Sequence, residues 1–352
     1  METKLLTLDR KHPDEAALSE AAKLLRAGEL VAFPTETVYG LGGDALDATA
    51  SRRIYAAKGR PSDNPLIVHI CDTAALSELA REIPPAAYRL AERFWPGPLT
   101  MILKKSGRVP SETTGGLDTV AIRMPSDPIA RALLAVSGVY IAAPSANASG
   151  RPSPTKASHV MDDLNGRIPL ILDGGPVEIG LESTIVDLSG DKPWILRPGY
   201  ITLAMLRELL PEVEYDPAVT RRQKDENLVA KAPGMKYRHY APKGSLRIYE
   251  GDLERVVEKV REEAFKKQRE GFRVAILASE ETKGRYPEFT VRSVGDRERE
   301  ETIAANLFDT LREFDRLGAD YIFGECFRQE GLGEAIMNRL LKAAGYQIED
   351  VG

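Results

Sequence analysis

Hydroxyl-bearing residues and glycines gather in the segment FPTETVYGLGGD, residues 33–44. It leaves an apolar run and enters a turn. The hydroxyls of Thr35 and Tyr39 can donate and accept hydrogen bonds, and the glycines let a backbone approach a ligand closely. A loop that only turns the chain is the alternative interpretation. The pattern GxxxxGK[ST] is absent, which excludes a Walker-type phosphate loop.

Two basic residues, Lys58 and Arg60, lie in the segment KGRPSDNPL, which follows a helix-like stretch. A lysine point charge and an arginine fork on one extended loop can both bind a single polyanion. Another polar segment, APSANASGRPS, follows an apolar run and contains Ser145 and Asn147. Loops at strand ends are where ligand sites concentrate. We therefore expect these four side chains to bind phosphate, although solvated surface pairs commonly give a KxR pattern.

Two arginines interrupt apolar strand-like runs, Arg123 in AIRMPSD and Arg197 in ILRPG. A buried arginine needs a partner, so each forms a structural ion pair or faces an anionic ligand. Ser183 and Thr184 add hydroxyls within GLESTIVDL. His69, inside LIVHI, is more typical of a hydrogen-bonded core histidine than of a catalyst.

Cations and aromatics are dense between the prolines of PGMKYRHYAP, residues 233–242. Such a segment can fold back as a lid that stacks on a base and neutralises phosphates. A connector without a function of its own is the alternative. The composition does not decide between the two.

The order of helix-like and strand-like stretches predicts the scaffold that holds these segments. Residues 1–209 alternate amphipathic stretches with many short apolar runs, which indicates an α/β domain. The short turns between runs favour a mixed sheet, because a parallel pair needs a long crossover. Residues 210–243 lack a sustained period and are interpreted as a linker or lid. Residues 244–352 predict a smaller three-layer α/β unit, with an apolar helical stripe at Ile303, Leu307, Phe308, Leu311 and Phe314.

Composition narrows the class of protein. The 352 residues carry a net charge of -5, so no overall cationic field attracts nucleic acid. The sequence starts without the apolar core of a signal peptide and has no apolar run of ~20 residues, so we expect a cytoplasmic protein without membrane contact. Cys71 and Cys326 lack histidines at ligand spacing. We expect two small buried residues there, and no disulfide or metal site.

Taken in order, these segments resemble the YrdC-like threonylcarbamoyl-AMP synthases, in the long form with a C-terminal Rossmann-like domain. The resemblance covers nearly the whole chain. It rests on PTETVYGLGGDA, KGRPSDNPL, WPGPLT, AIRMPSD, APSANASGRPSPT, GLESTIVDL, ILRPG, PGMKYRHYAP and EGLGEAIMNRLLKAA.

The resemblance implies a reaction and its partners. L-threonine and bicarbonate would give N-carboxythreonine, whose new carboxylate attacks the α-phosphate of ATP and releases pyrophosphate. The product, threonylcarbamoyl-AMP, would pass to a separate tRNA threonylcarbamoyl transferase that modifies adenosine 37. Stable direct binding of tRNA by this chain is not expected.

The resemblance also implies where the substrates bind. ATP, with Mg2+, would contact Lys58, Arg60, Ser145, Asn147, Arg197, Tyr237, Arg238 and His239. The threonine and carbamate pocket would use Thr35, Tyr39, His69, Arg123, Ser183 and Thr184. No protein nucleophile is expected, because displacement at phosphorus needs mainly positioning and charge neutralisation.

Three other functions compete with this one. The fold is associated with double-stranded RNA binding, so an RNA-binding or regulatory module is one alternative. A carbamoyl-transfer maturation factor is another, but it is expected to carry acylphosphatase-like and zinc-binding modules that this sequence lacks. The C-terminal domain could bind a nucleotide independently, yet it has no GxGxxG after a strand.

Overall fold

The computed structural model describes residues 2–220, 231–233 and 239–352, and the chain divides into two units. The first unit contains most of residues 2–220 together with Lys231–Pro233. The second contains residues 239–352 and the short segment Gly150–Pro152. The boundaries expected from the sequence, at residues 209 and 243, remain predictions.

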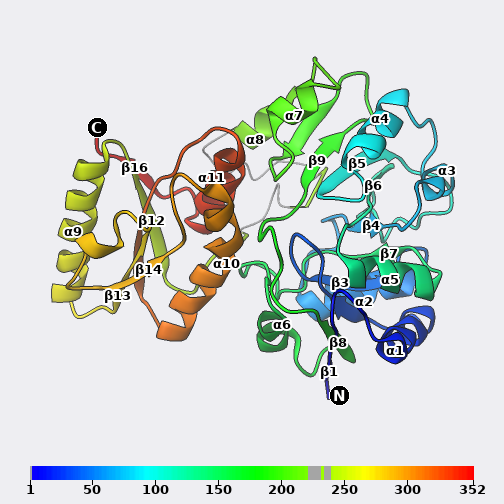
Figure 1. Cartoon of the computed structure of the whole chain (residues 1–352), viewed down its shortest axis with the longest axis horizontal. Coiled ribbons are helices and arrows are strands. Elements are labelled where there is room, and N and C mark those ends of the chain that lie inside the picture. The colour runs from blue at the N-terminus through cyan, green and yellow to red at the C-terminus, as the bar shows by residue number, and fades with distance from the viewer. Residues whose placement is uncertain (1, 221–230, 234–238) are drawn as a thin grey trace. The chain divides into compact units, whose positions relative to one another are not determined.

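Within the described first unit, eleven strands form one mixed sheet in the order β1-β8-β2-β3-β7-β4-β6-β5-β9-β10-β11 (Figure 1). The strands are β1 (Lys4–Thr7), β2 (Val31–Phe33), β3 (Gly40–Asp44), β4 (Ile67–His69), β5 (Leu99–Lys104), β6 (Thr119–Arg123), β7 (Ile141–Ala142), β8 (Leu170–Asp173), β9 (Thr184–Asp187), β10 (Trp194–Arg197) and β11 (Glu214–Tyr215). Both parallel and antiparallel pairs occur along the sheet, which confirms the predicted mixed architecture.

The helices of this unit cover both faces of the sheet. They are α1 (Glu15–Arg26), α2 (Ala48–Lys58), α3 (Leu76–Leu79), α4 (Pro85–Phe94), α5 (Pro128–Ser137), α6 (Ala157–Leu164), α7 (Leu203–Arg207) and α8 (Pro217–Thr220). Successive side chains of a strand point to opposite faces. Val31 and Phe33 of β2 therefore pack in the cluster with α1 and α5, while Ala32 joins the larger core on the other face.

The glycines of residues 40–43, which the sequence predicts to lie in a turn, instead belong to strand β3 (Gly40–Asp44). Its glycines permit close packing. A Cβ on Gly42 would lie 2.7 Å from Ile141 and 2.8 Å from Phe33. Gly59 is needed for its backbone conformation instead. Its φ of 62° is left-handed and ends α2 at Lys58, and a residue with a side chain would be strained there.

In the described second unit, five parallel strands form a sheet in the order β14-β13-β15-β12-β16. The strands are β12 (Ser245–Glu250), β13 (Val274–Ala278), β14 (Thr290–Ser293), β15 (Tyr321–Glu325) and β16 (Ile348–Asp350). Helix α9 (Leu253–Arg269) covers one face, and α10 (Glu300–Leu317) and α11 (Leu332–Ala343) cover the other (Figure 1). The predicted stripe of α10 is buried, which confirms the three-layer prediction.

Two features differ from the sequence expectations. The expectation that both cysteines are buried is wrong, since Cys71 is exposed and Cys326 is half-buried. Within the segment 210–243, Glu214–Tyr215 forms β11, which pairs with β10, and Pro217–Thr220 forms α8.

Among the described residues, no helix is long and apolar enough to span a bilayer.

Candidate functional site

Lys58 connects the two polar segments that the sequence predicts as a phosphate site. It is the last residue of α2 rather than part of an extended loop, and it is 2% exposed. Its Nζ donates to the carbonyl of Ser145 at 2.5 Å and to the carbonyl of Asn147 at 2.6 Å. The KxR and SxN segments, more than eighty residues apart in sequence, therefore lie together.

The SxN loop is held by further hydrogen bonds. Ser145 Oγ donates to Asn147 Oδ1 at 2.6 Å, and Asn147 Nδ2 donates to the carbonyl of Ala148. The loop amide of Ser149 donates to the carbonyl of Lys58 at 2.8 Å. Arg60, half-buried, donates to carbonyls of its own loop, at Asn64 and Pro65. The arrangement places a buried ammonium group beneath a loop of hydroxyl, amide and backbone groups that can bind phosphate oxygens.

A second group of polar residues lies in one row across three adjacent strands. His69 at the end of β4 is the register partner of Arg123 at the end of β6. Arg123 pairs in turn with Thr100 of β5. Ile185 of β9 follows in the row, flanked along its own strand by Thr184. Neighbouring strands lie about 4.8 Å apart, so strand pairing alone fixes the spacing of these side chains.

The loop after β2 folds around its own hydroxyls. Thr35 Oγ1 donates to the carbonyl of Val38 at 2.7 Å and accepts from the amides of Thr37 and Val38. Arg123 Nη1 donates to Thr37 Oγ1 at 2.8 Å. Glu36 of the same loop forms an ion pair with Arg123, with Oε1 2.6 Å from Nη2. The hydroxyl of Thr35 thus shapes the loop that reaches Arg123.

His69 is buried and uncharged at neutral pH. Burial, together with the neighbouring charge of Arg123, lowers the pKa of His69 from 6.5 to about 3. Its Nδ1 lies 3.0 Å from the carbonyl of Ile67.

Ser183 lies between β5 and β10. Its Oγ is 2.7 Å from Thr100 Oγ1, and it accepts from Arg197 Nη2 at 3.1 Å. Arg197 Nε also donates to the carbonyl of Ser183 at 3.0 Å. The hydroxyl of Thr184 donates instead to the carbonyl of Ile201. Ser183 and Arg197 are therefore brought together, whereas the Thr184 hydroxyl is used to hold the segment after β10.

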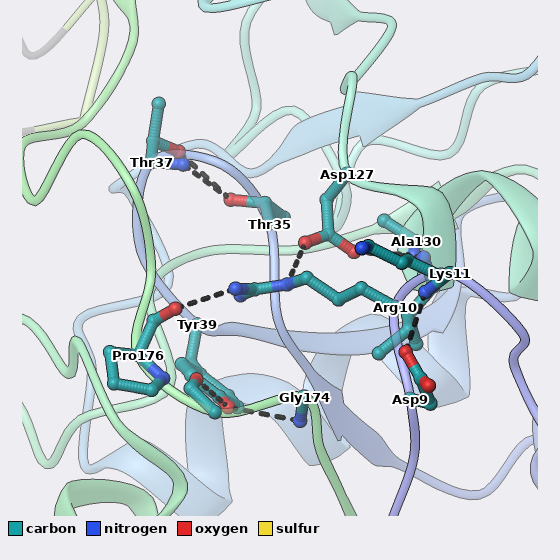
Figure 2. Close-up of polar contacts among 12 residues, drawn as sticks. Asp9, Arg10, Lys11, Thr35, Thr37, Tyr39, Asp127, Ala130, Gly174 and Pro176 are labelled. Carbon is teal, nitrogen blue, oxygen red and sulfur yellow. Dashed lines mark hydrogen bonds and ion pairs between the residues drawn. The ribbon is translucent and has the colours of Figure 1, made fainter.

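Figure 2 shows an arginine from the amino-terminal segment beside Thr35 and Tyr39. Arg10 Nε donates to Asp127 Oδ2 at 2.9 Å, and Nη1 donates to the carbonyl of Pro176 at 2.7 Å. Tyr39 is fully buried, and its hydroxyl donates to the carbonyl of Gly175 at 2.6 Å. Burial and the nearby charge of Asp173 raise the pKa of Tyr39 above its usual value. Tyr39 and Arg10 thus hold the loop that follows β8.

That loop returns to the polar segment after β2. The amide of Ile179 donates to the carbonyl of Glu36, and the amide of Gly180 donates to the carbonyl of Thr37. The loop after β8, which Arg10 and Tyr39 hold, therefore helps to position the residues around Arg123.

The predicted lid residues are only partly placed. Tyr237 and Arg238 lie outside the described residues. His239 belongs to the second unit, where its ring centroid is 5.5 Å from that of Tyr240.

Sequence reasoning missed several residues of this region. Glu36 and Thr37 lie inside the polar segment of residues 33–44. An acidic residue between two threonines was the signal that could have pointed to them. Thr100 is a polar residue inside the apolar run LTMILK, which was also visible. Arg10 had no local signal, because its partner Asp127 is 117 residues away.

No group of three or more histidine, cysteine or acidic residues with metal-binding geometry occurs in the part of the chain that the structure describes. The groups assembled around Lys58 and the SxN loop are donors and neutral acceptors, together with the carboxylate of Asp163, whose Oδ2 accepts from the amide of Ala148 at 3.1 Å.

Comparison with protein families accounts for both units. A family model of the Sua5, YciO and YrdC proteins, described as telomere recombination, matches residues 23–199. A second model, described as the C-terminal domain of threonylcarbamoyl-AMP synthase, matches residues 201–345.

Individual relatives match over nearly their full lengths. A threonylcarbamoyl-AMP synthase of Pyrococcus abyssi is 50% identical over 96% of this chain and 97% of its own length. One of Bacillus subtilis is 49% identical over 97% of this chain and 96% of its own. The crystal structure of P. abyssi Sua5 complexed with L-threonine superposes with a TM-score of 0.94 at 49% identity, covering 99% of this chain and all of that one.

Proposed function

The chain belongs to the threonylcarbamoyl-AMP synthase family, and we propose that it joins L-threonine, bicarbonate and ATP into threonylcarbamoyl-AMP with release of pyrophosphate. The family resemblance and the two-unit α/β fold expected from the sequence are both confirmed. The observation that carries the proposal is the assembly of Lys58 with the SxN loop, which follows β7, the strand that pairs with β4 of the polar row.

The nucleotide would bind at the loop held by Lys58. We propose that Lys58, Arg60, Ser145 and Asn147 neutralise and orient the triphosphate, and that Arg197 contacts the nucleotide beside Ser183. Fixed cationic and dipolar groups stabilise the charge that moves onto the leaving pyrophosphate. Mg2+ would enter with ATP and add positive charge at the phosphate oxygens.

L-threonine would bind at the row of strand-end residues. Arg123 offers a positive charge for its carboxylate. Thr35, His69 and Ser183 lie in the same region, each beside Arg123 or beside a residue that pairs with Arg123. Because His69 is uncharged, Arg123 supplies the positive charge in this region. Tyr39 and Thr184, whose hydroxyls are engaged with backbone carbonyls, would support the pocket from behind.

The chemistry needs no covalent enzyme intermediate. The threonine nitrogen forms a C–N bond with the carbon of bicarbonate, and one oxygen leaves as water. A carboxylate oxygen of the resulting carbamate then bonds to the α-phosphorus of ATP, and the bond to the bridging oxygen of pyrophosphate breaks. The protein would contribute proximity, alignment and shelter of the carbamate from water. Tyr237, Arg238 and His239 are proposed to provide part of that shelter.

The C-terminal unit is proposed to have a regulatory or lid-supporting role rather than to bind a nucleotide. Rossmann-like sheets bind ligands at the carboxyl ends of their strands. There, Arg297 Nη2 lies 2.6 Å from the fully buried carboxylate of Glu325 and Nε donates to Ser279 Oγ. The guanidinium also lies 5.0 Å from the ring of Phe327. The buried Glu325 carboxylate pairs with Arg297 at the carboxyl ends of the strands. Its negative charge makes this place unfavourable for binding a phosphate.

The product would be passed to a tRNA threonylcarbamoyl transferase, and stable binding of tRNA by this chain is not proposed. The cytoplasmic location expected from the sequence remains a prediction.

The decisive experiment measures pyrophosphate release from ATP with L-threonine, bicarbonate and Mg2+ together, and with each omitted in turn. Mass spectrometry then identifies the adenylate. Release that requires both threonine and bicarbonate is the expected result. Binding of ATP or RNA without release would favour the regulatory or RNA-binding alternative.

A further inference from the structure

Glu36 and Arg123 form a buried ion pair. Both side chains are 5% exposed, and Glu36 Oε1 lies 2.6 Å from Arg123 Nη2. Glu36 comes from the loop between β2 and β3, whereas Arg123 ends β6. The loop thus places a carboxylate against an arginine that strand pairing has already fixed beside His69 and Thr100.

The contact is governed by charge more than by hydrogen-bond direction. Both oxygens of Glu36, and Nε and Nη2 of Arg123, are buried and have no hydrogen-bond partner of suitable geometry among the described residues. Arg123 does make one directed bond, from Nη1 to Thr37 Oγ1 at 2.8 Å. Two successive residues therefore hold one guanidinium, Glu36 by charge and Thr37 by a hydrogen bond.

Stability is a weak reason for such a pair. Removing two ions from water costs several kcal/mol each, and well-packed apolar residues often serve stability as well or better. The Arg10–Asp127 pair differs, because its carboxylate also accepts from the amides of Ile129 and Ala130 at the start of α5. Glu36 caps no helix by its side chain. Its carboxylate faces Arg123, which suggests that its role concerns the arginine.

We propose that Glu36 is a positioning residue that sets the orientation of Arg123, so that the guanidinium meets the carboxylate of L-threonine in one geometry. The proposal rests on the proposed function, since it takes Arg123 as the group that binds that carboxylate. The Glu36 charge holds one side of the guanidinium against the loop, and Thr37 fixes the nitrogen Nη1. A guanidinium held in advance loses less entropy when the substrate binds.

The test compares ligands that differ only at the carboxylate. The full-length wild-type protein, Glu36→Gln and Glu36→Asp are titrated with L-threonine and with L-threoninol, which has a hydroxymethyl group in place of the carboxylate. The KM values for L-threonine and ATP are measured separately. Glu112→Gln is the matched control, because Glu112 forms an exposed ion pair with Arg52.

Wild type should prefer L-threonine over L-threoninol, and Glu36→Gln should lose most of that preference. We expect the KM for L-threonine to rise roughly 10- to 100-fold in Glu36→Gln, as for other small misplacements of a binding group. The KM for ATP should change little. Glu36→Asp, which keeps the charge on a shorter side chain, should recover part of the preference. Glu112→Gln should behave as wild type.

Three results would overturn the proposal: an unchanged KM for L-threonine in Glu36→Gln, an equal loss of affinity for both ligands, or a wild type that binds both ligands alike. If Glu36→Gln fails to fold, Thr37→Val provides the second variant, and it must then lose the preference. Wild-type pyrophosphate release is recorded in parallel. Its absence would reject the proposed function, whereas its presence with an unaffected Glu36→Gln would reject only the role of Glu36.

Discussion

Arg10 Nε lies 2.9 Å from Asp127 Oδ2, although 117 residues separate the two in the sequence. Asp127 is buried and caps α5 by accepting from the amides of Ile129 and Ala130. Arg10 also donates to the carbonyl of Pro176, so one side chain joins the amino-terminal segment to the α5 cap and to the loop after β8 (Figure 2).

Disrupting this pair should destabilise the first unit. We expect Arg10→Gln and Asp127→Asn each to lower the free energy of unfolding by about 1.5–3 kcal/mol, because each removes a hydrogen bond to a charged group. Asparagine keeps an oxygen that can cap α5. The double variant should lose about 1 kcal/mol less than the sum of the two single losses. Urea denaturation measures all three, and additive losses would refute the coupling.

The matched control for that cycle is Lys4→Gln. Lys4 pairs with Glu20 at 2.6 Å, but the two side chains are 52% and 43% exposed. An exposed pair of this kind contributes at most about 1 kcal/mol. A loss as large as that of Arg10→Gln would show that burial does not distinguish the two pairs.

Lys58→Ala and Arg60→Ala should lose turnover while the fold survives. Removing a group that stabilises developing phosphate charge costs roughly 10²- to 10³-fold in rate. Lys58→Ala should have the larger effect, because it also frees the SxN loop at Ser145 and Asn147. Pyrophosphate release gives the rates, and Arg52→Ala, an exposed position on α2, is the control. Wild-type rates in both variants would remove these residues from the site.

His69 should make the protein less stable as pH falls below about 6.5. Its pKa is about 3 in the folded state and ordinarily 6.5, so the unfolded chain binds a proton that the folded chain does not. The loss approaches about 1.4 kcal/mol per pH unit between these values, and none arises above them.

His69→Asn, whose amide can still donate to the carbonyl of Ile67, should lack this dependence. Urea denaturation at several pH values compares the two chains, and NMR titration of the imidazole tests the assignment directly. The prediction would be contradicted if the stability of the two proteins changed equally with pH. An imidazole that titrates near pH 6.5 in the folded protein would also contradict it.

Removal of the lid and the C-terminal unit should impair turnover. A chain ending at residue 220 keeps β11 and α8, which belong to the first unit. We expect its pyrophosphate release to fall at least about tenfold, because bound reactants would be less well aligned and sheltered. The full-length triple variant Tyr237→Ala, Arg238→Ala and His239→Ala separates loss of the lid from loss of the domain. Full activity of both proteins would reject the lid.

The sequence by itself determined the features that depend on local patterns. The spacing of apolar residues and the positions of turn residues predicted the mixed sheet of the first unit and the buried stripe of α10. This was possible because backbone geometry determines which side chains share a face. The motifs around Lys58 and Asn147 were visible because each occupies a few consecutive residues. The family they indicate was visible for the same reason.

Only the tertiary structure decided which distant residues meet. Strand order and register place His69, Arg123 and Thr100 in one row, and no local pattern encodes a register between strands that are separated by other elements. The Arg10–Asp127 pair and the contact of Glu36 with Arg123 likewise arise only when segments far apart in the sequence pack together. Charges far apart in the sequence become partners there, because a buried charge needs an opposite charge or hydrogen bonds to offset its lost hydration.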